Sequence, residues 1–259
     1  MIALSNGNLN WVSDGFTLGP LHFVQDWSEN ALWRLTQYPE FILMKSRDNV
    51  ETYIRVLSGS EIILSNILEL GIMRGGSCAF FNTLLAPKHH LAIDICERES
   101  GLGHLAQLVT LDGRKFVARY DVSQTDTDRI ARLFSEMSGS EALFDLIIDD
   151  ASHDYDLTLK AFNGLFPLLR PGGIYALEDW GWAHWGPWQD PSHPSFASPG
   201  MSNIVFYAAL SCTSRGAGVI SRVEVTPVTT FVFRGPDPIE PGFAVEHSYA
   251  ARGRNLPLL

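Results

Sequence analysis

Acidic residues are concentrated directly after one apolar segment of this chain. The segment LFDLII is followed by two aspartates, the second of which is Asp150, and His153 comes three residues later. A second apolar segment, GGIYAL, is followed by Glu178, 28 residues after Asp150, and then by Asp179. If the two segments are neighbouring strands, their ends bring three carboxylates to one place. Carboxylates that close together do not all stay ionised without a cation, so this spacing predicts a metal site.

The types of ligand atom restrict which metal fits. Asp150, Glu178 and Asp179 offer only oxygen atoms, and no cysteine lies near them in the sequence. Hard divalent ions such as Mg²⁺ and Mn²⁺ prefer oxygen ligands, whereas zinc prefers nitrogen and sulfur. We therefore predict that these three carboxylates bind Mg²⁺ or Mn²⁺ and that His153 stays outside the metal's ligands. Alternatively, the Glu178 and Asp179 pair is a solvated strand end, and His153 is a surface or capping residue.

Alternating strands and helices are expected to position these side chains. From about residue 62, short segments rich in Ile, Val, Leu and Phe alternate with segments of helical periodicity. This alternation predicts an α/β fold with a doubly wound, mostly parallel sheet, which binds ligands at the carboxyl ends of its strands. The expected strands are ILSNILELG, HHLAIDI, KFVARYD, LFDLIIDD, GGIYALED and TFVFRG, and the expected helices are SCAFFNTLLA, GHLAQLVTL, TDRIARLFSEM, DLTLKAFNGLFPLL and MSNIVFYAALSC.

Several boundaries of these elements can also be predicted. The fourth helix is expected to stop at the segment RPGG, and Asp154 and Asp156 are expected to cap its start. Near the C-terminus, SRVEVTPVTTFVFRG predicts two strands joined by a short turn, so that an antiparallel strand completes the sheet. Residues 1–60 are expected to form an extension, a lid or a dimer contact, with a helix at SRDNVETYIRVL capped by Ser46 or Asp48.

The composition excludes several classes of partner. The chain has 259 residues, 46% of them apolar, and a formal net charge of −10, which disfavours nucleic acid and anionic membranes. Its three cysteines form no Cys-x-x-Cys pair, so neither a disulfide framework nor a zinc ribbon is expected. The first residues, MIALSNGNLN, lack the basic and apolar parts of a signal peptide. We therefore expect a soluble, cytoplasmic protein with no membrane segment.

A glycine-rich loop follows the first expected strand. The order of its residues is Glu69, Gly71, then Gly75, Gly76 and Ser77. Glycines let the backbone turn sharply and approach a ligand closely, and the N-terminus of the following helix offers N–H groups. The spacing differs from the G-x-G-x-x-G of dinucleotide-binding loops, and the lysine of a P-loop is missing.

Two more carboxylates lie at the ends of the next two expected strands. Asp94 ends the second strand, where a carboxylate can accept hydrogen bonds from both hydroxyls of a ribose. Asp121 ends the third strand and is followed by Ser123 and Gln124, which suit the edge of an adenine. An ordinary tight turn explains the glycines alone, but it does not explain why Asp94 and Asp121 accompany them. Together they indicate a nucleoside-containing ligand.

These motifs resemble those of the class I S-adenosylmethionine-dependent methyltransferases over about residues 60–235. Within that family, E-x-G-x-x-x-G-G-S is similar to the variant found in sugar O-methyltransferases, such as the macrolide-sugar and mycobacterial methylmannose enzymes. Those enzymes also carry D-x-x-H with E-D one strand later. The resemblance implies a Rossmann-like, seven-stranded sheet with an antiparallel C-terminal strand, formed by a methyltransferase domain at residues 61–259 that follows the N-terminal extension.

The resemblance also implies a role for each motif. Asp149 would face the amino group of the cofactor, S-adenosyl-L-methionine, or else make a structural hydrogen bond. His153 would be the base that accepts the proton of a sugar hydroxyl, and the three carboxylates would bind Mg²⁺. The other cofactor-binding residues implied are Glu69, Gly71, Gly75, Gly76 and Ser77 at the methionine portion, Asp94 at the ribose, and Asp121, Ser123 and Gln124 around the adenine.

A tryptophan-rich segment, WGWAHWGPWQDPSHPSF, follows the predicted metal ligands. It holds four of the seven tryptophans of the chain, and its prolines argue against a helix. We predict that Trp180, Trp182 and Trp185 form a wall for the acceptor, since aromatic faces contact sugar C–H groups and indole N–H groups donate to hydroxyls. The alternative is an aromatic cluster that fixes a long loop in place.

Other functions remain open at this stage. A metal-dependent methyltransferase acting on catechols or phenols would use a similar set of ligands. A nicotinamide-dependent oxidoreductase would share the fold, but it needs a dinucleotide loop and no metal site. A non-catalytic scaffold would lack the chemistry, whereas each catalytic position here is occupied. The expected partner is a small sugar or glycan acceptor, and a homo-oligomer is possible.

Overall fold

Strands and helices alternate through most of the chain in the computed structural model. The structure describes residues 9–32, 34, 38–98, 101–139, 141, 143–213, 218–254 and 257–259. The chain divides into two compact units, one with Met1–Ser123 and Ala131–Ala142 and the other with Gln124–Ile130 and Leu143–Leu259. Each unit is described by itself below.

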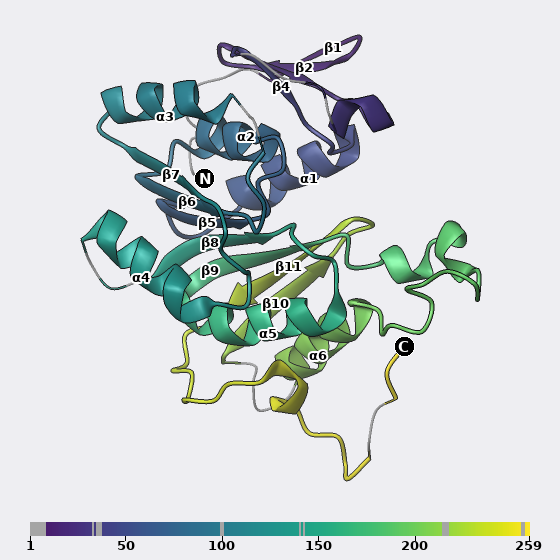
Figure 1. Ribbon diagram of the computed structural model, residues 1–259. Helices are drawn as coiled ribbons and strands as arrows, with labels where there is room; N and C mark the ends of the chain where they lie inside the picture. The colour runs from purple at the N-terminus through teal and green to yellow at the C-terminus, as the bar shows by residue number, and fades with distance from the viewer. Residues whose placement is uncertain are drawn as a thin grey trace. The chain divides into compact units, whose positions relative to one another are not determined.

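The first unit begins with a small sheet that the sequence did not predict. Its strands are β1 (Asn10–Val12), β2 (Gly15–Leu18), β3 (Leu21–Val24) and β4 (Glu40–Ile42), in that order, and β3 and β4 are parallel. These strands are only three or four residues long, which is why their alternation is hard to recognise in the sequence. The small sheet lies beside helices α1 and α2 (Figure 1).

Aromatic packing fixes the small sheet to helix α2 (Gly76–Leu85). Phe16 of β2 and Phe23 of β3 stack with their ring centroids 5.0 Å apart, and the ring of Phe80 meets each of them edge-on at 6.0 Å. All three side chains are fully buried. These residues of the small sheet are therefore part of the hydrophobic core of this unit.

Three parallel strands and two helices complete the first unit, and a third helix is divided between the two units. Strands β5 (Asn66–Leu70), β6 (His89–Ile93) and β7 (Lys115–Arg119) pair in that order. Helix α1 (Arg47–Ser58) begins after Ser46, whose hydroxyl accepts a hydrogen bond from the Asn49 N–H, as predicted. Helix α3 (Leu102–Leu111) connects β6 to β7, and helix α4 (Thr127–Ser138) follows β7.

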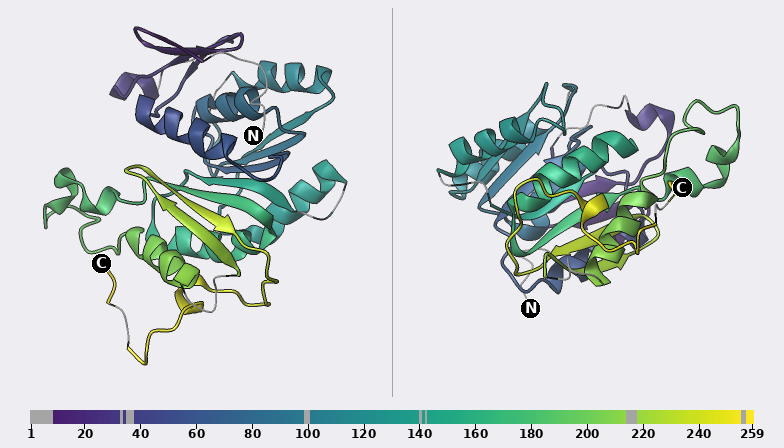
Figure 2. Two further views of the ribbon diagram at one scale, coloured as in Figure 1. Left: turned by 180° about the vertical axis from the view of Figure 1, so that it is seen from behind. Right: turned by 90° about the horizontal axis from the view of Figure 1, so that it is seen from below.

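The second unit contains the acidic strand ends. Strands β8 (Phe144–Asp149) and β9 (Leu169–Glu178) are parallel, and β11 (Thr229–Arg234) pairs antiparallel with both β9 and β10 (Ile220–Val225). Helices α5 (Tyr155–Leu165) and α6 (Ser202–Thr213) run along these strands (Figure 2). Five short 3-10 helices are also present in the described residues: Glu29–Leu32, Phe166–Leu168, Trp182–His184, Gly186–Gln189 and Val245–His247.

The larger sheet confirms the predicted fold class. It has seven strands in the order β10-β11-β9-β8-β5-β6-β7. Most of them are parallel, and β11, near the C-terminus of the chain, is antiparallel to both of its neighbours, β9 and β10. One predicted boundary was wrong, because the segment RPGG lies inside β9 and the preceding helix ends earlier, at Leu165. The division into an extension and a methyltransferase domain near residue 60 stays a prediction.

Candidate active site

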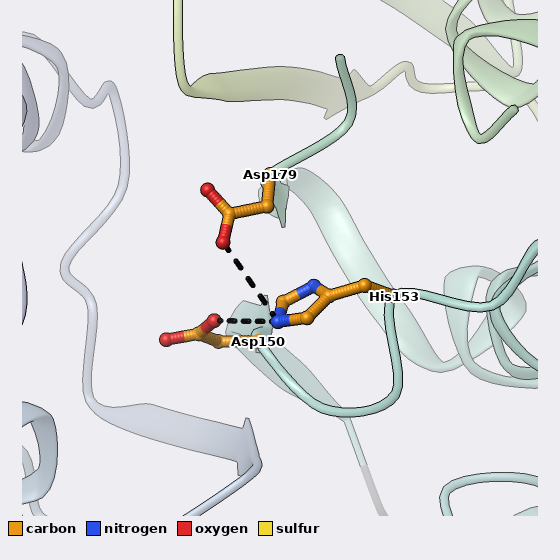
Figure 3. A group of neighbouring side chains, drawn as sticks. All are labelled: Asp150, His153 and Asp179. Atoms are coloured by element: carbon orange, nitrogen blue, oxygen red, sulfur yellow. Dashed lines mark ion pairs between the residues drawn. The ribbon is translucent and has the colours of Figure 1, made fainter. Parts of the chain in front are cut away.

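Three side chains at the ends of β8 and β9 converge on one another. The Nε2 atom of His153 lies 3.6 Å from Asp150 Oδ1 and 3.8 Å from Asp179 Oδ2 (Figure 3). Among the described residues they form a group whose ligand atoms all lie within 4.8 Å of one another. We call Asp150, His153 and Asp179 the acidic group. These distances exceed those of hydrogen bonds, and the two carboxylates lie close enough to share one ion beside His153.

The register of the strands explains this convergence. Asp149 of β8 is paired with Leu177 of β9 in parallel, so the residues that follow each of them leave the sheet at the same edge. Helix α5 then begins at Tyr155 after Asp154, whose carboxylate accepts a hydrogen bond from the Leu157 N–H, as predicted. The turn between β8 and α5 is therefore short, and it directs His153 back toward Asp150.

Two members of the acidic group have an unusual backbone conformation. The φ angles of His153 and Asp179 are +52° and +50°, in the left-handed region that non-glycine residues rarely adopt. Such a conformation costs on the order of 1–3 kcal/mol and is found most often at functional sites. The side chains of the acidic group are about one-third exposed, at 28%, 34% and 35% for Asp150, His153 and Asp179, so a ligand from solvent can reach them.

Two neighbouring acids are buried. Glu178 is only 3% exposed and is not part of the acidic group. His153 lies beside Asp150 and Asp179, and the role of Glu178 as a third metal ligand stays a prediction. Asp149 is 2% exposed and accepts a hydrogen bond of 2.6 Å from the Tyr175 hydroxyl. Burial raises the pKa of Asp149 to about 6, although the hydrogen bond from Tyr175 opposes this shift.

The tryptophan-rich loop contacts the backbone of the second unit. The indole N–H of Trp180 donates to the Thr226 carbonyl oxygen at 2.9 Å, and that of Trp182 donates to the His153 carbonyl oxygen at 2.8 Å. Both groups are thus already bonded, which is not what an acceptor wall of free indole donors requires. Trp185 is 42% exposed. The predicted contacts of these tryptophans with a substrate stay predictions.

In the first unit, the glycines form a tight turn between β5 and α2. Gly71 and Gly75 have φ angles of +94° and +79°, and Gly71 donates its N–H to the Ile93 carbonyl oxygen at 2.9 Å. A Cβ atom on Gly76 would lie 1.9 Å from the carbonyl oxygen of Ile42 in β4. Only glycine fits there, because that neighbour is backbone and cannot move aside as a side chain would. Ser77 follows in the first turn of α2 and is half-buried.

Asp94 holds the glycine loop, residues 71–76, in place. Its Oδ2 atom accepts hydrogen bonds from the N–H groups of Ile72 and Met73, at 2.9 and 3.1 Å, and its Oδ1 atom accepts one from Cys96 at 2.9 Å. A carboxylate has about four acceptor positions, so three are already used. Asp94 therefore shapes the loop, and its predicted contact with a ribose would have to use the remaining capacity.

A buried polar network below the loop was not predicted from the sequence. Glu69 and His90 are both fully buried, and Glu69 Oε2 lies 3.1 Å from His90 Nε2. The other ring nitrogen of His90 is 2.7 Å from the Asn82 side-chain amide in α2. The thiol of Cys78 lies beside them, and burial, followed by the charge of Glu69, raises its pKa well above the usual value. Glu69 has no exposed surface, and its predicted contact with the cofactor stays a prediction.

The predicted adenine-binding residues follow β7. Asp121 is exposed and has a φ angle of +55°, and Ser123 is half-buried. Gln124 is 7% exposed, and its side-chain oxygen accepts a hydrogen bond from the Ser152 N–H at 3.1 Å. Its side-chain nitrogen is buried without a hydrogen-bond partner in the structure. Buried donors are rarely left unpaired, which is a reason to expect a ligand or a water molecule there.

One protein-family model matches part of the chain. Residues 68–180 match the family model described as "Methyltransferase domain". This range begins in β5 and ends just after β9, so it includes the glycine loop, Asp94 and the acidic group.

Curated relatives match parts of the chain. A stretch of 147 residues is 30% identical to the mycinamicin VI 2''-O-methyltransferase of Micromonospora griseorubida and covers 52% of this chain and 33% of that protein. Another stretch of 70 residues is 37% identical to the demethylmacrocin O-methyltransferase of Streptomyces fradiae and covers 27% of this chain and 16% of that protein. The matched part is thus no more than a third of either relative.

A solved structure shows the same fold. The MycE methyltransferase from the mycinamycin biosynthetic pathway, in complex with Mg and SAH, superposes with a TM-score of 0.53 at 22% identity, covering 71% of this chain and 49% of that chain. At this identity the likeness establishes the fold alone.

Among the residues that the structure describes, no helix combines the length and apolar character needed to cross a bilayer.

Proposed function

We propose, on the premise that residues 68–180 form a methyltransferase domain, that this chain transfers a methyl group from S-adenosyl-L-methionine to a hydroxyl of a sugar-bearing acceptor with the help of Mg²⁺ or Mn²⁺. The observation that carries the proposal is the convergence of Asp150, His153 and Asp179 at the end of β8 and β9. The names of two further relatives support the class of acceptor, because they contain sugar groups: 8-demethyl-8-alpha-L-rhamnosyl tetracenomycin-C 2'-O-methyltransferase of Streptomyces olivaceus and L-olivosyl-oleandolide 3-O-methyltransferase of Streptomyces antibioticus.

The donor atoms of the acidic group fit a hard divalent ion. The two carboxylates lie close enough to share one ion, with His153 beside them, and the partial exposure of the group leaves room for oxygen atoms of an acceptor. A divalent ion bound there would supply Lewis acidity to an acceptor hydroxyl and a template for its orientation. Asp150 and Asp179 would hold the ion, and Glu178 stays a predicted third carboxylate.

His153 would remove the proton of the hydroxyl. Its Nε2 atom points toward both carboxylates of the acidic group, which stabilise the positive charge that the ring gains with a proton. The methyl group of S-adenosyl-L-methionine is already activated by its sulfonium, so the protein has to deprotonate and align the acceptor. We expect no covalent intermediate with the protein.

The cofactor would bind at the glycine loop. Gly71, Gly75 and Gly76 allow close approach of a ligand to the backbone, and Ser77 in the first turn of α2 can contact the methionine portion. Asp94 would face the ribose. Asp121, Ser123 and Gln124 would flank the adenine, with the unpaired amide of Gln124 as one available donor.

A methyl-transfer screen tests this function. The purified protein is incubated with labelled S-adenosyl-L-methionine and two panels of acceptors, glycosides and phenols, with Mg²⁺ or with EDTA. We expect methylation of glycosides that EDTA abolishes and Mg²⁺ restores. In a His153→Ala variant kcat should fall by about 10²- to 10⁴-fold, the usual contribution of a general base. The control is His247→Ala, because His247 is exposed and lies outside the acidic group.

Each part of the proposal can fail separately. Absence of S-adenosyl-L-methionine binding would remove the proposed function as a whole. Turnover that persists after complete chelation would remove the metal. Methylation of phenols but of no glycoside would change the class of acceptor and keep the rest.

A further inference from the structure

We propose that Trp182 is a positioning residue that holds the acidic group in its active geometry by bonding to the backbone of both His153 and Asp179. This inference rests on the proposed function for its catalytic meaning. The contacts that support it are independent of that function, and all of them lie within the second unit.

Trp182 makes two hydrogen bonds to the strand ends that carry the acidic group. Its indole N–H donates to the carbonyl oxygen of His153 at 2.8 Å, and its backbone N–H donates to the carbonyl oxygen of Asp179 at 3.1 Å. One residue thus connects the turn after β8 to the turn after β9. The two turns are distant in sequence, so their spacing depends on such contacts.

Both acceptor residues have strained backbones. His153 and Asp179 both have left-handed φ angles, +52° and +50°. A strained conformation persists only when its surroundings fix it, and a hydrogen bond to the carbonyl of the same residue is one way to do so. We infer that without the indole bond the His153 turn relaxes toward an ordinary φ angle, which moves the imidazole away from Asp150.

The loop around Trp182 is itself anchored. His184 Nε2 lies 2.7 Å from the Ser202 hydroxyl, and the Gln189 side-chain amide donates to the Ala183 carbonyl oxygen at 2.7 Å. The ring of Trp188 packs edge-on against that of Trp182, with centroids 5.0 Å apart. Trp182 is therefore held from several directions and can in turn fix the residues it contacts.

These contacts favour positioning over direct contact with an acceptor. An indole has a single N–H donor, and that of Trp182 is already used by the His153 carbonyl. An acceptor hydroxyl would have to displace this bond. The aromatic face remains able to contact an acceptor, which gives the experiment its alternative outcome.

Two tryptophan-to-phenylalanine variants separate the bond from the packing. Trp182→Phe removes the indole N–H and keeps an aromatic ring and the backbone N–H. Trp188→Phe is the matched control, since it makes the same change in the ring that packs against Trp182 and leaves the bond to His153 in place. Both variants are made in the full chain, and their folding is checked by circular dichroism and thermal unfolding.

Three measurements are made on both variants. Calorimetric titration with Mn²⁺ measures ion binding without turnover. Steady-state kinetics with the best glycoside separates kcat from KM. Amide hydrogen exchange measured by NMR reports the backbone of residues 151–154.

We expect Trp182→Phe to weaken Mn²⁺ binding and to lower kcat by roughly three- to tenfold each, the usual net effect of one hydrogen bond, with the KM for the acceptor unchanged. Amides of residues 151–154 should exchange faster in this variant. Trp188→Phe should leave all three measurements close to those of the unmodified protein.

Several results would overturn the inference. Unchanged exchange at residues 151–154 in Trp182→Phe would show that the bond does not fix the turn. A higher KM with unchanged kcat would make Trp182 an acceptor contact. Equal losses in both variants would assign the effect to aromatic packing. If the unmodified protein transfers no methyl group, the proposed function fails, yet the exchange measurement still decides the positioning role.

Discussion

The glycine loop and the acidic group are built in opposite ways. Around the loop, the backbone is fixed by buried side chains: Glu69 and His90 have no exposed surface, and Asp94 accepts three backbone N–H bonds. In the acidic group, the side chains are about one-third exposed and make no hydrogen bond to one another, and strain lies in the backbone that carries them. The first region buries Glu69 and His90, whereas the second exposes its side chains partly to solvent.

This difference predicts which property a substitution in each region will change. Polar groups that are buried and paired are costly to disturb, because a lost partner leaves an unsatisfied group in the core. Half-exposed carboxylates close together repel one another and contribute little to folding until a cation joins them. Substitutions in the first region should therefore change mainly stability, and those in the second mainly ion binding and turnover.

The largest effect on stability is expected for Glu69→Ala. This change leaves a cavity in the core and removes the carboxylate that lies 3.1 Å from the His90 ring, and truncating a buried side chain of this size to alanine typically costs about 2–5 kcal/mol. Chemical denaturation measures the free energy of unfolding. Glu69→Gln is the milder control, because it keeps the volume and a hydrogen-bonding oxygen. A loss below about 1 kcal/mol for Glu69→Ala would mean that this pair does not stabilise the loop.

An intermediate effect is expected for Gly76→Ala. The added Cβ atom would lie 1.9 Å from the Ile42 carbonyl oxygen, and overpacking of this kind costs about 1–3 kcal/mol. Gly103→Ala in α3 is the matched control, since no atom lies within 4 Å of its added Cβ. That variant should be unchanged or more stable by about 0.4–1 kcal/mol. Thermal unfolding of the two variants side by side compares them, and equal melting temperatures would contradict the close approach of β4.

The smallest effect on stability is expected for Asp179→Asn. Asparagine tolerates a left-handed φ angle as well as aspartate does, and the change removes one of two carboxylates that repel each other. In EDTA the free energy of unfolding should stay within about 0.5 kcal/mol of the original value. Mn²⁺ binding and methyl transfer should nevertheless be lost, as calorimetry and the transfer assay can show. A large loss of stability with ion binding retained would reverse the comparison between the two regions.

Much of the fold could be predicted from the sequence because its signals are local. Apolar segments ending in carboxylates marked β5 to β9, and helical periodicity marked α2 to α6. The parallel register then brings the residues after Asp149 and Leu177 to one edge, which is why the approach of Asp150 to Asp179 could be expected. Helix caps at Ser46 and Asp154 followed from side-chain chemistry alone.

What could not be predicted depends on contacts between distant residues or on the direction of a side chain. Glu178 and Asp179 are adjacent, but Glu178 is the buried last residue of β9, whereas Asp179 lies beyond the strand with a φ angle of +50°. The direction of the Asp179 side chain therefore does not follow from the alternation of strand residues. Nothing local in the sequence shows that the Trp182 indole bonds to His153 or that His90 pairs with Glu69.

The close approach of Gly76 to Ile42 has a consequence for how this protein can be cut and recombined. The carbonyl oxygen of Ile42 in β4 occupies the space that a side chain at position 76 would need. The packing of β4 and that of α2 therefore depend on each other. A chimera that joins residues 61–259 to a foreign N-terminal segment would lose β4 and keep α2, so it would separate two elements that fit each other. A chimera should therefore keep β1 to β4 together with the rest of the chain and be joined before β1, rather than near residue 60.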